Sequence, residues 1–202
     1  MRRSGIWAVG LLVVMVLAST ANAAPTCRTA LLVIDMQANL LAFGGSRLQT
    51  VYGQPILERV ESVVDLVRDA GLPMIYAKFV NGDLQTNADH FHFCESIAPA
   101  GSDTVIARTD PDVFADPALH DLLQEEGITQ LLICGLYSTC CVNTAVLRGA
   151  ELGYSIVVIK DGHGDYQANR SAAIEAQAHW VSMENVRAVK LADIDLGSLC
   201  HP

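Results

Sequence analysis

The residues best placed for chemistry in this chain are two adjacent cysteines, Cys140 and Cys141. The apolar run 131–134 ends at a glycine, a few small polar residues follow, and helical spacing then begins, which predicts a strand, a tight turn and a helix start. Free N–H groups and the positive end of the helix dipole favour a thiolate there. In α/β proteins, ligands bind at this place, outside the carboxyl ends of the strands. The pattern predicts a nucleophilic cysteine, and the spacing leaves open which of the two it is.

Asp35 is a second candidate, because it directly follows the apolar run 30–34, which is typical of a buried parallel strand. A carboxylate in this place can cap the next turn, or it can act as a general base beside a thiol. For the cysteines, the alternative is burial as small hydrophobic residues. No C-x-x-C, Walker, G-x-G-x-x-G or G-x-S-x-G pattern occurs. Their absence argues against thioredoxin-like, nucleotide-binding and Ser-His-Asp sites, and we expect no cofactor.

The first residues have the pattern of a signal peptide. Arg2 and Arg3 form a charged start, residues 6–18 an apolar stretch, and residues 21–23 an A-x-A cleavage site. We therefore expect residues 1–23 to be removed and the mature domain, 24–202, to be exported into a bacterial periplasm or the medium. An uncleaved membrane anchor is the alternative, but the apolar stretch is short for a bilayer span.

The remaining chain is acidic. Removing Arg2 and Arg3 from 13 Lys and Arg leaves 11 against 22 Asp and Glu, a net charge of −11. Such a chain repels nucleic acids and anionic membranes, so we expect neither as a partner. The expected ligand is a small molecule that is neutral or locally steered.

Six cysteines are many for one domain, and export permits disulfides. Cys27 and Cys200 lie near the two ends of the mature chain, and chain ends are often close in a domain, so a bond between them is plausible. The connectivity among Cys27, Cys94, Cys140 and Cys200 stays open. Cys134, inside an apolar strand, is the best candidate for an inert buried thiol.

Strand and helix patterns alternate along the mature chain, which predicts one doubly wound, Rossmann-like α/β domain with about six mostly parallel strands flanked by helices. A polar, irregular loop over 81–103 separates the second strand from the third. The expected strands are 30–34, 73–80, 105–107, 130–134, 155–159 and 186–189, and the expected helices are 55–70, 118–126, 141–152 and 170–183.

Two separate motifs resemble those of the isochorismatase-like cysteine hydrolases, a group that includes the nicotinamidases. Residues 30–37, ALLVIDMQ, are similar to the opening signature of that family, and residues 135–142, GLYSTCCV, to its nucleophile turn. In that turn the nucleophilic cysteine is followed by valine, which points to Cys141. The residues Thr144-Ala145, Gly153-Tyr154 and Asp161 also fit the family pattern, and the likeness runs from about residue 29 to about 194.

The resemblance implies a catalytic triad of aspartate, lysine and cysteine, here Asp35, Arg108 and Cys141. The position that matches the lysine holds arginine. Arginine keeps the positive charge and offers a rigid fork of donors, but its pKa stays above about 12, so it does not readily donate a proton. Lys78, on the second expected strand, is an alternative source of an amine, although a lysine there usually extends into solvent.

The resemblance also implies a cis peptide at Leu136–Tyr137 and an oxyanion hole formed by the backbone N–H groups of Tyr137 and Cys141. The predicted substrate pocket comprises Gln37, Phe43, Phe114 and Tyr137. Some relatives hold a metal near the segment Asp89-x-x-His92, but this chain lacks a further histidine, and we expect a solvated loop and no metal. His163 follows the fifth strand and is expected to be a loop histidine.

These features predict an exported hydrolase that cleaves a small amide or carbamoyl C–N bond through a thioester on the cysteine. One alternative is hydrolysis of a vinyl ether, as in isochorismate, which uses the aspartate as an acid and needs no cysteine nucleophile. Another is a domain of the same fold that has lost catalysis and binds a small ligand or a protein, for which the missing lysine is the best argument. Relatives commonly assemble, so we expect a homo-oligomer.

Overall fold

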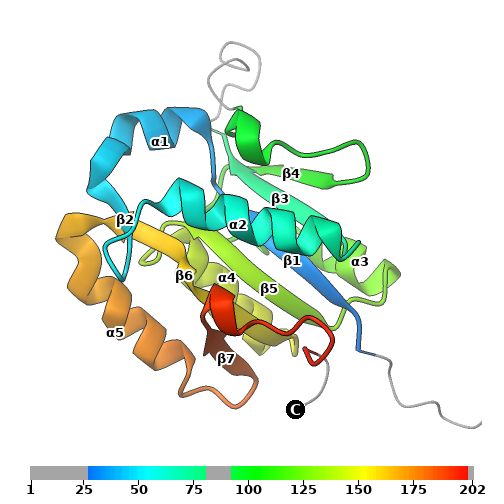
Figure 1. The fold of residues 1–202 in the computed structure, drawn as a ribbon. Coiled ribbons are helices and arrows are strands. Elements are labelled where there is room, and N and C mark those ends of the chain that lie inside the picture. The colour runs from blue at the N-terminus through cyan, green and yellow to red at the C-terminus, as the bar shows by residue number, and fades with distance from the viewer. Residues whose placement is uncertain (1–26, 81–91, 200–202) are drawn as a thin grey trace, which may run out of the picture.

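A computed structural model describes residues 27–80 and 92–199 (Figure 1). The predicted signal peptide, residues 1–23, lies outside these ranges. The strands are β1 (Thr29–Ile34), β2 (Leu48–Thr50), β3 (Met74–Phe79), β4 (Thr104–Arg108), β5 (Gln130–Leu136), β6 (Ser155–Tyr166) and β7 (Val186–Val189). The α-helices are α1 (Ala38–Gly44), α2 (Ile56–Asp69), α3 (Ala118–Glu125), α4 (Cys141–Glu151) and α5 (Arg170–Trp180).

The strands form one sheet in the order β2-β6-β5-β1-β3-β4, with β7 paired to β6. Every pairing is parallel except that between β2 and β6. The predicted doubly wound α/β fold is therefore confirmed, with a seventh strand, β2, that the sequence did not reveal. The middle of the sheet holds β1 between β3 and β5, so the carboxyl ends of three parallel strands meet at one edge.

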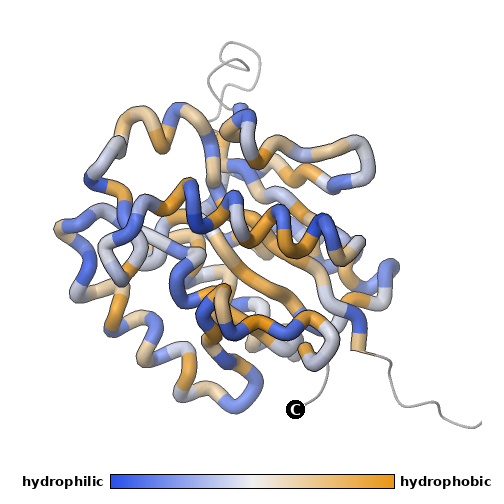
Figure 2. The backbone as a smooth tube through the Cα atoms, in the orientation of Figure 1, coloured by the Kyte–Doolittle hydropathy of each residue, from blue (hydrophilic) through white to orange (hydrophobic). Residues whose placement is uncertain are grey.

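The two faces of the sheet bury separate sets of side chains. Leu31 and Val33 of β1 belong to a cluster with the buried valines of α2. Leu32 and Ile34 point to the other face and belong to a cluster with α3 and α4. The alternation follows from the two-residue period of a strand, and burial on both faces explains the nearly continuous apolar sequence of the central strands (Figure 2).

Strand β6 is much longer than predicted. The expected strand ended at Ile159, but β6 continues to Tyr166, and its last residues pair with β2 in antiparallel fashion. The apolar pattern stops at Lys160 because the second half buries polar side chains, Asp161, His163 and Asp165. Each of these is hydrogen-bonded, so burial costs less than the sequence pattern suggests.

Strand β5 also runs past its predicted end, through Gly135 to Leu136. Gly135 has φ +121°, and a Cβ there would lie 2.1 Å from the carbonyl oxygen of Ile34. Only glycine permits this close approach of β5 to the end of β1. The contact sets the turn after β5 directly beside Asp35.

The cysteines fall into two classes. Cys27 is disulfide-bonded, and Cys94, Cys134, Cys140 and Cys141 are free. Cys200, the predicted partner of Cys27, lies outside the described residues. Cys134 is fully buried, as expected, and burial raises the pKa of its thiol. Within the described ranges, no helix is long and apolar enough to cross a membrane.

Candidate active site

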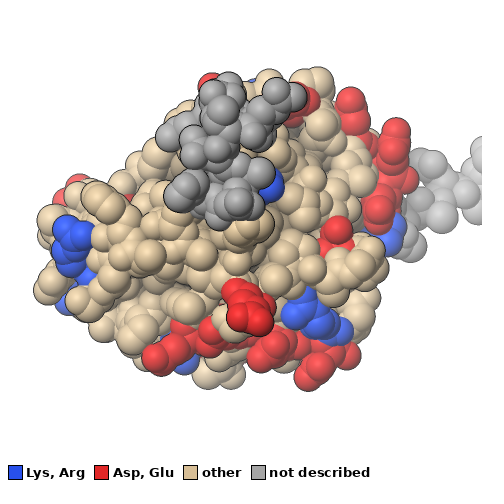
Figure 3. Space-filling view, turned by 90° about the horizontal axis from the view of Figure 1, so that it is seen from above, with Lys and Arg blue, Asp and Glu red and all other residues tan. Residues whose placement is uncertain are grey.

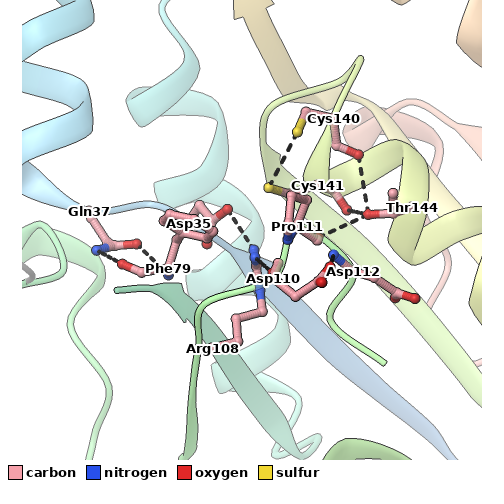
Figure 4. A network of polar contacts seen from close by, with 10 residues as sticks. All are labelled: Asp35, Gln37, Phe79, Arg108, Asp110, Pro111, Asp112, Cys140, Cys141 and Thr144. Carbon is pink, nitrogen blue, oxygen red and sulfur yellow. Dashed lines mark hydrogen bonds and ion pairs between the residues drawn. The ribbon is translucent and has the colours of Figure 1, made fainter. Parts of the chain in front are cut away.

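Three elements deliver the predicted triad to one point (Figure 4). Asp35 follows β1, Arg108 ends β4, and Cys141 begins α4 after the turn that leaves β5. Strand β3 lies between β1 and β4, so Arg108 must extend across the end of β3 to meet Asp35. Its guanidinium passes 5.5 Å from the centre of the Phe79 ring, a cation–π distance. Asp35 itself adopts φ +54°, a left-handed conformation that aspartate tolerates better than most residues.

Asp35 and Arg108 form a buried ion pair. Nη2 of Arg108 lies 2.6 Å from Oδ2 of Asp35, and the two side chains are only 4% and 2% exposed. Nη1 of Arg108 donates to the carbonyl oxygen of Asp110. Within the described residues, Oδ1 of Asp35 and Nε of Arg108 lack hydrogen-bond partners at ordinary distances. The cation that contacts Asp35 is thus Arg108, at the position that matches the family's lysine, whereas Lys78 is half-buried on β3.

The pKa of the Asp35 carboxyl is raised. Burial raises it, and the positive charge of Arg108 and hydrogen bonding to Cys141 oppose this effect without cancelling it. A carboxylate that is harder to keep ionised is a stronger base than an exposed aspartate. The environment therefore suits Asp35 to accept a proton from a neighbouring thiol.

Cys141 is 5% exposed, and the pKa of its thiol is raised, foremost by burial and then by the charge of Asp35 and a hydrogen bond to it. Arg108 acts in the opposite direction, but it does not prevail. Burial and the adjacent carboxylate therefore oppose the effect of the helix start, which favours a thiolate.

The turn between β5 and α4 presents backbone donors beside the thiol. The Leu136–Tyr137 peptide is cis, as the resemblance implies. The Tyr137 carbonyl accepts from the N–H groups of Cys140 and Val142. Across the described part of the chain, the N–H groups of Tyr137 and Cys141 have no acceptor, so both remain available for an oxyanion.

The four predicted pocket residues occupy different environments. Gln37 is fully buried, and its amide bonds to both the N–H and the carbonyl of Phe79. Tyr137 is half-buried and stacks on Tyr166, with ring centres 5.4 Å apart. Phe43 is 73% exposed on α1. Phe114 is a core residue that packs against α4, so only Gln37 and Tyr137 lie immediately beside the triad.

The sequence did not identify the groups that support the nucleophile turn. His163 is fully buried, not a loop residue, and joins Ser138 of the turn to Gln177 of α5. Gln177 Oε1 can only accept, so Nε2 of His163 donates to it, and Nδ1 accepts from the Ser138 hydroxyl at 2.8 Å. Asp165 accepts from both the N–H and the hydroxyl of Thr139. The two-residue spacing of these polar residues along β6 was the only available signal.

The segment for which we expected no metal, residues 89–92, lies outside the described residues except for its last residue. In the ranges 27–80 and 92–199, no group of three or more His, Cys, Asp and Glu side chains is arranged to hold a metal ion.

The buried imidazole predicts a loss of stability in mild acid. Burial lowers the pKa of His163 from 6.5 to about 4, so the unfolded state binds a proton more readily than the native state. The contribution of neutral His163 to the free energy of unfolding is fully present above pH 6.5. It is lost as the pH drops toward 4, by up to about 3 kcal/mol. Urea unfolding of His163→Gln should show a flatter pH profile than the native chain. His179→Gln, at an exposed site, serves as the control, and equal profiles for all three proteins would refute the prediction.

Comparisons with known proteins identify the family. The family model described as the isochorismatase domain matches residues 29–186. A streptothricin hydrolase of Streptomyces noursei is 29% identical over 140 residues, 68% of this chain and 50% of that protein. A probable inactive nicotinamidase of Arabidopsis thaliana is 29% identical over 155 residues, 66% of this chain and 79% of that protein.

The solved structures include an N-carbamoylsarcosine amidase from Thermoplasma acidophilum, with a TM-score of 0.67 and 17% identity. The match covers 83% of this chain and 99% of that structure, and at this identity it establishes the fold alone. The family model spans most of the described residues and includes Asp35, Arg108 and Cys141. This chain belongs to the isochorismatase family of hydrolases.

Proposed function

We propose that this protein hydrolyses a small amide or carbamoyl C–N bond through a thioester on Cys141. The observation that carries the proposal is the convergence of the Cys141 thiol, at the start of α4, on a carboxyl that follows β1 and is itself held by a buried cation (Figure 4). A nucleophile, a base and a group that orients the base are the parts of a covalent acyl-transfer site. The family's hydrolytic relatives supply the reaction class.

The proposed reaction needs one proton carrier. Asp35 removes the proton of the Cys141 thiol, and the sulfur attacks the carbonyl carbon. The N–H groups of Tyr137 and Cys141 stabilise the oxyanion. As the C–N bond breaks, protonated Asp35 gives its proton to the leaving amine. Asp35 then takes a proton from water, the hydroxide attacks the thioester, and the thiol is restored when the sulfur leaves with that proton.

In this scheme Arg108 stays protonated and transfers no proton. Its charge keeps Asp35 oriented and offsets the negative charge that moves between Asp35 and the sulfur. An arginine is suited to this task because the two nitrogens of its fork hold different partners, the Asp35 carboxylate and the Asp110 carbonyl. The substitution of the family's lysine is therefore compatible with catalysis.

The substrate class follows from the relatives and from the charge of the surface. The printed names of two relatives, streptothricin hydrolase and N-carbamoylsarcosine amidase, motivate tests on amide and carbamoyl compounds. In the view of Figure 3, acidic side chains gather along the lower and right borders, and much of the remaining described surface carries no charge. An acidic protein repels anions, which favours a small, uncharged substrate.

A second candidate function is the binding of a ligand without turnover. Arginine in place of lysine and the raised pKa of Cys141 favour it, and one relative is named as a probable inactive nicotinamidase. The experiments below separate it from the hydrolase.

One prediction of this proposal concerns the nucleophile. Cys141→Ala should lower kcat for amide hydrolysis at least about a thousandfold, because the covalent route is lost, and should leave the fold intact. Release of the amine from a panel of small amides and carbamoyl compounds measures this. Cys94→Ser, which removes a free thiol elsewhere, is the matched control.

Acid-quenched native enzyme should carry an acyl group on Cys141 in its intact mass. Turnover without an adduct, retained in Cys141→Ala, would instead indicate vinyl-ether-type chemistry. A native chain that binds but never converts the panel would establish the second candidate.

Another prediction of this proposal concerns Arg108. Arg108→Lys keeps the positive charge beside Asp35, so kcat should stay within about tenfold of the native value. Arg108→Met removes the charge and leaves a buried carboxylate unpaired, so kcat should fall at least about a hundredfold and stability by about 3–5 kcal/mol. Steady-state kinetics and urea unfolding of both variants measure these effects. A large gain of activity in Arg108→Lys would show that proton transfer by the lysine matters.

We further propose export, for which the pattern of residues 1–23 and the disulfide at Cys27 are the support. Expression of the full chain in a bacterial host should give a mature protein outside the cytoplasm with an intact mass that begins near Ala24. Ala23→Phe, which blocks a cleavage site that needs small residues, should prevent processing. A full-length product in the cytoplasm would contradict export.

The assembly of the protein into a homo-oligomer stays a prediction.

A further inference from the structure

In the turn between β5 and α4, Ser138 is held to β6 by both its backbone and its side chain. Its N–H donates to the carbonyl oxygen of Gly164, and its hydroxyl donates to Nδ1 of His163, at 2.8 Å in each case. Ser138 directly follows Tyr137, one of the two residues whose N–H groups are assigned to the oxyanion. A group that fixes Ser138 therefore also fixes the direction of an oxyanion donor.

The imidazole of His163 is itself held from its other side by α5. Its Nε2 donates to Oε1 of Gln177 at 3.1 Å, and its ring meets the ring of Trp180 edge to face, with ring centres 5.2 Å apart. Nε1 of Trp180 donates to Oδ1 of Asn143 at 2.8 Å, and Asn143 lies two residues after Cys141 in α4. These contacts form a closed path from the turn through β6 and α5 to the start of the helix that carries the nucleophile.

Stability alone does not account for an imidazole in this place. His163 is fully buried, and burial lowers the pKa of its imidazole to about 4, so the ring is neutral at pH 7. An apolar side chain of similar size would fill the same space without the cost of removing polar atoms from water. It would not accept a hydrogen bond from Ser138. The property that the imidazole adds is therefore the direction that this bond imposes on the turn.

We propose that His163 is a positioning residue of the hydrolase, which holds the Ser138 hydroxyl and thereby keeps the N–H groups of the turn aimed at the oxyanion. The role rests on the proposed function. His163 acts through Ser138 and not on the reacting atoms, so its effect is expected where the oxyanion forms, in the transition state, and not in the binding of the substrate. A misplacement of about 1 Å can lower a rate about a hundredfold, so the loss of this bond should appear in kcat.

The test is a double-mutant cycle between Ser138 and His163 on the full chain. His163→Leu, Ser138→Ala and the double variant all remove the same bond, so kcat for amide hydrolysis should fall at least about tenfold in each, with KM within about threefold of the native value. His163→Gln, whose amide can accept from Ser138 and donate to Gln177, should recover most of kcat. His120→Leu is the matched control, because it removes a histidine that bonds the Tyr154 hydroxyl on α3, and it should keep the native kcat.

Unfolding separates this role from a purely structural one. His163→Leu leaves the buried Ser138 hydroxyl without its acceptor, which should lower the urea midpoint of unfolding. Removal of that hydroxyl in the double variant should recover most of the lost midpoint, whereas kcat should stay as low as in either single variant. Nitrogen NMR of the native protein should show His163 protonated at Nε2. Recovery of kcat together with stability in the double variant, or an imidazole protonated at Nδ1, would overturn the proposal.

Binding of acetaldehyde tests the turn without turnover. The Cys141 thiol adds to the aldehyde, so that an S–C bond forms and the thiol proton passes to the former carbonyl oxygen, which then lies at the oxyanion donors. Carbon NMR of labelled acetaldehyde measures this adduct. The native protein should bind at least about tenfold more tightly than His163→Leu or Ser138→Ala, because both variants lose the alignment of the donors. Cys141→Ala should form no adduct.

The two readouts distinguish failure of this role from failure of the hydrolase. Hydrolysis with unchanged kcat in His163→Leu and Ser138→Ala would overturn the positioning role and leave the enzyme standing. Acetaldehyde binding that depends on His163 and Ser138, in a protein that hydrolyses nothing, would support the positioning of the turn and refute the proposed enzyme. Native protein that neither hydrolyses the panel nor binds acetaldehyde would overturn both.

Discussion

The buried ion pair between Asp35 and Arg108 is the interaction on which the site depends. Removing one partner of such a pair typically costs about 3–5 kcal/mol, so both charges must be present for the local fold to hold. The pair also links two strands that are not neighbours in the sheet. Arg108 ends β4 and Asp35 follows β1, and β3 lies between these two strands. Gln37 reinforces this arrangement by bonding both backbone groups of Phe79 at the end of β3. The same contacts therefore stabilise the carboxyl ends of these strands and hold the Asp35 carboxylate in place.

The pair has a chemical consequence, since Asp35 and Cys141 compete for one proton. Burial raises the pKa of each group, and the negative charge of Asp35 raises that of the thiol further. Both effects favour the protonated thiol. A protonated, buried thiol reacts slowly with oxidants, because the thiolate is the reactive form. The burial that raises the pKa of Asp35 therefore also shields Cys141.

The sequence predicted the parts whose signal is local. Apolar runs located six strands, and Asp35 and the pair of Cys140 and Cys141 stood out because each follows a buried strand. The choice of Cys141 came from the resemblance to the family. The second half of β6 was missed because its buried residues are polar, and only their partners in other elements, such as Ser138 for His163, make that burial tolerable. Phe43 and Phe114 were predicted to line the pocket, but the sequence does not reveal the direction of their side chains. Their side chains point to solvent and to the core, and one residue of register decides such a direction.

The replacement of lysine by arginine changes which groups of the site can transfer a proton. Lysine offers one nitrogen that can hold or move a proton, whereas the Arg108 fork binds Asp35 with one nitrogen and the Asp110 carbonyl with the other. The cation thus ties the segment after β4 to the site as well as orienting the base. In the proposed mechanism the cation stays protonated, and Asp35 and Cys141 exchange the proton. That transfer would depend on the distance and the pKa balance between these two groups, which β1, Gly135 and the turn before α4 set together.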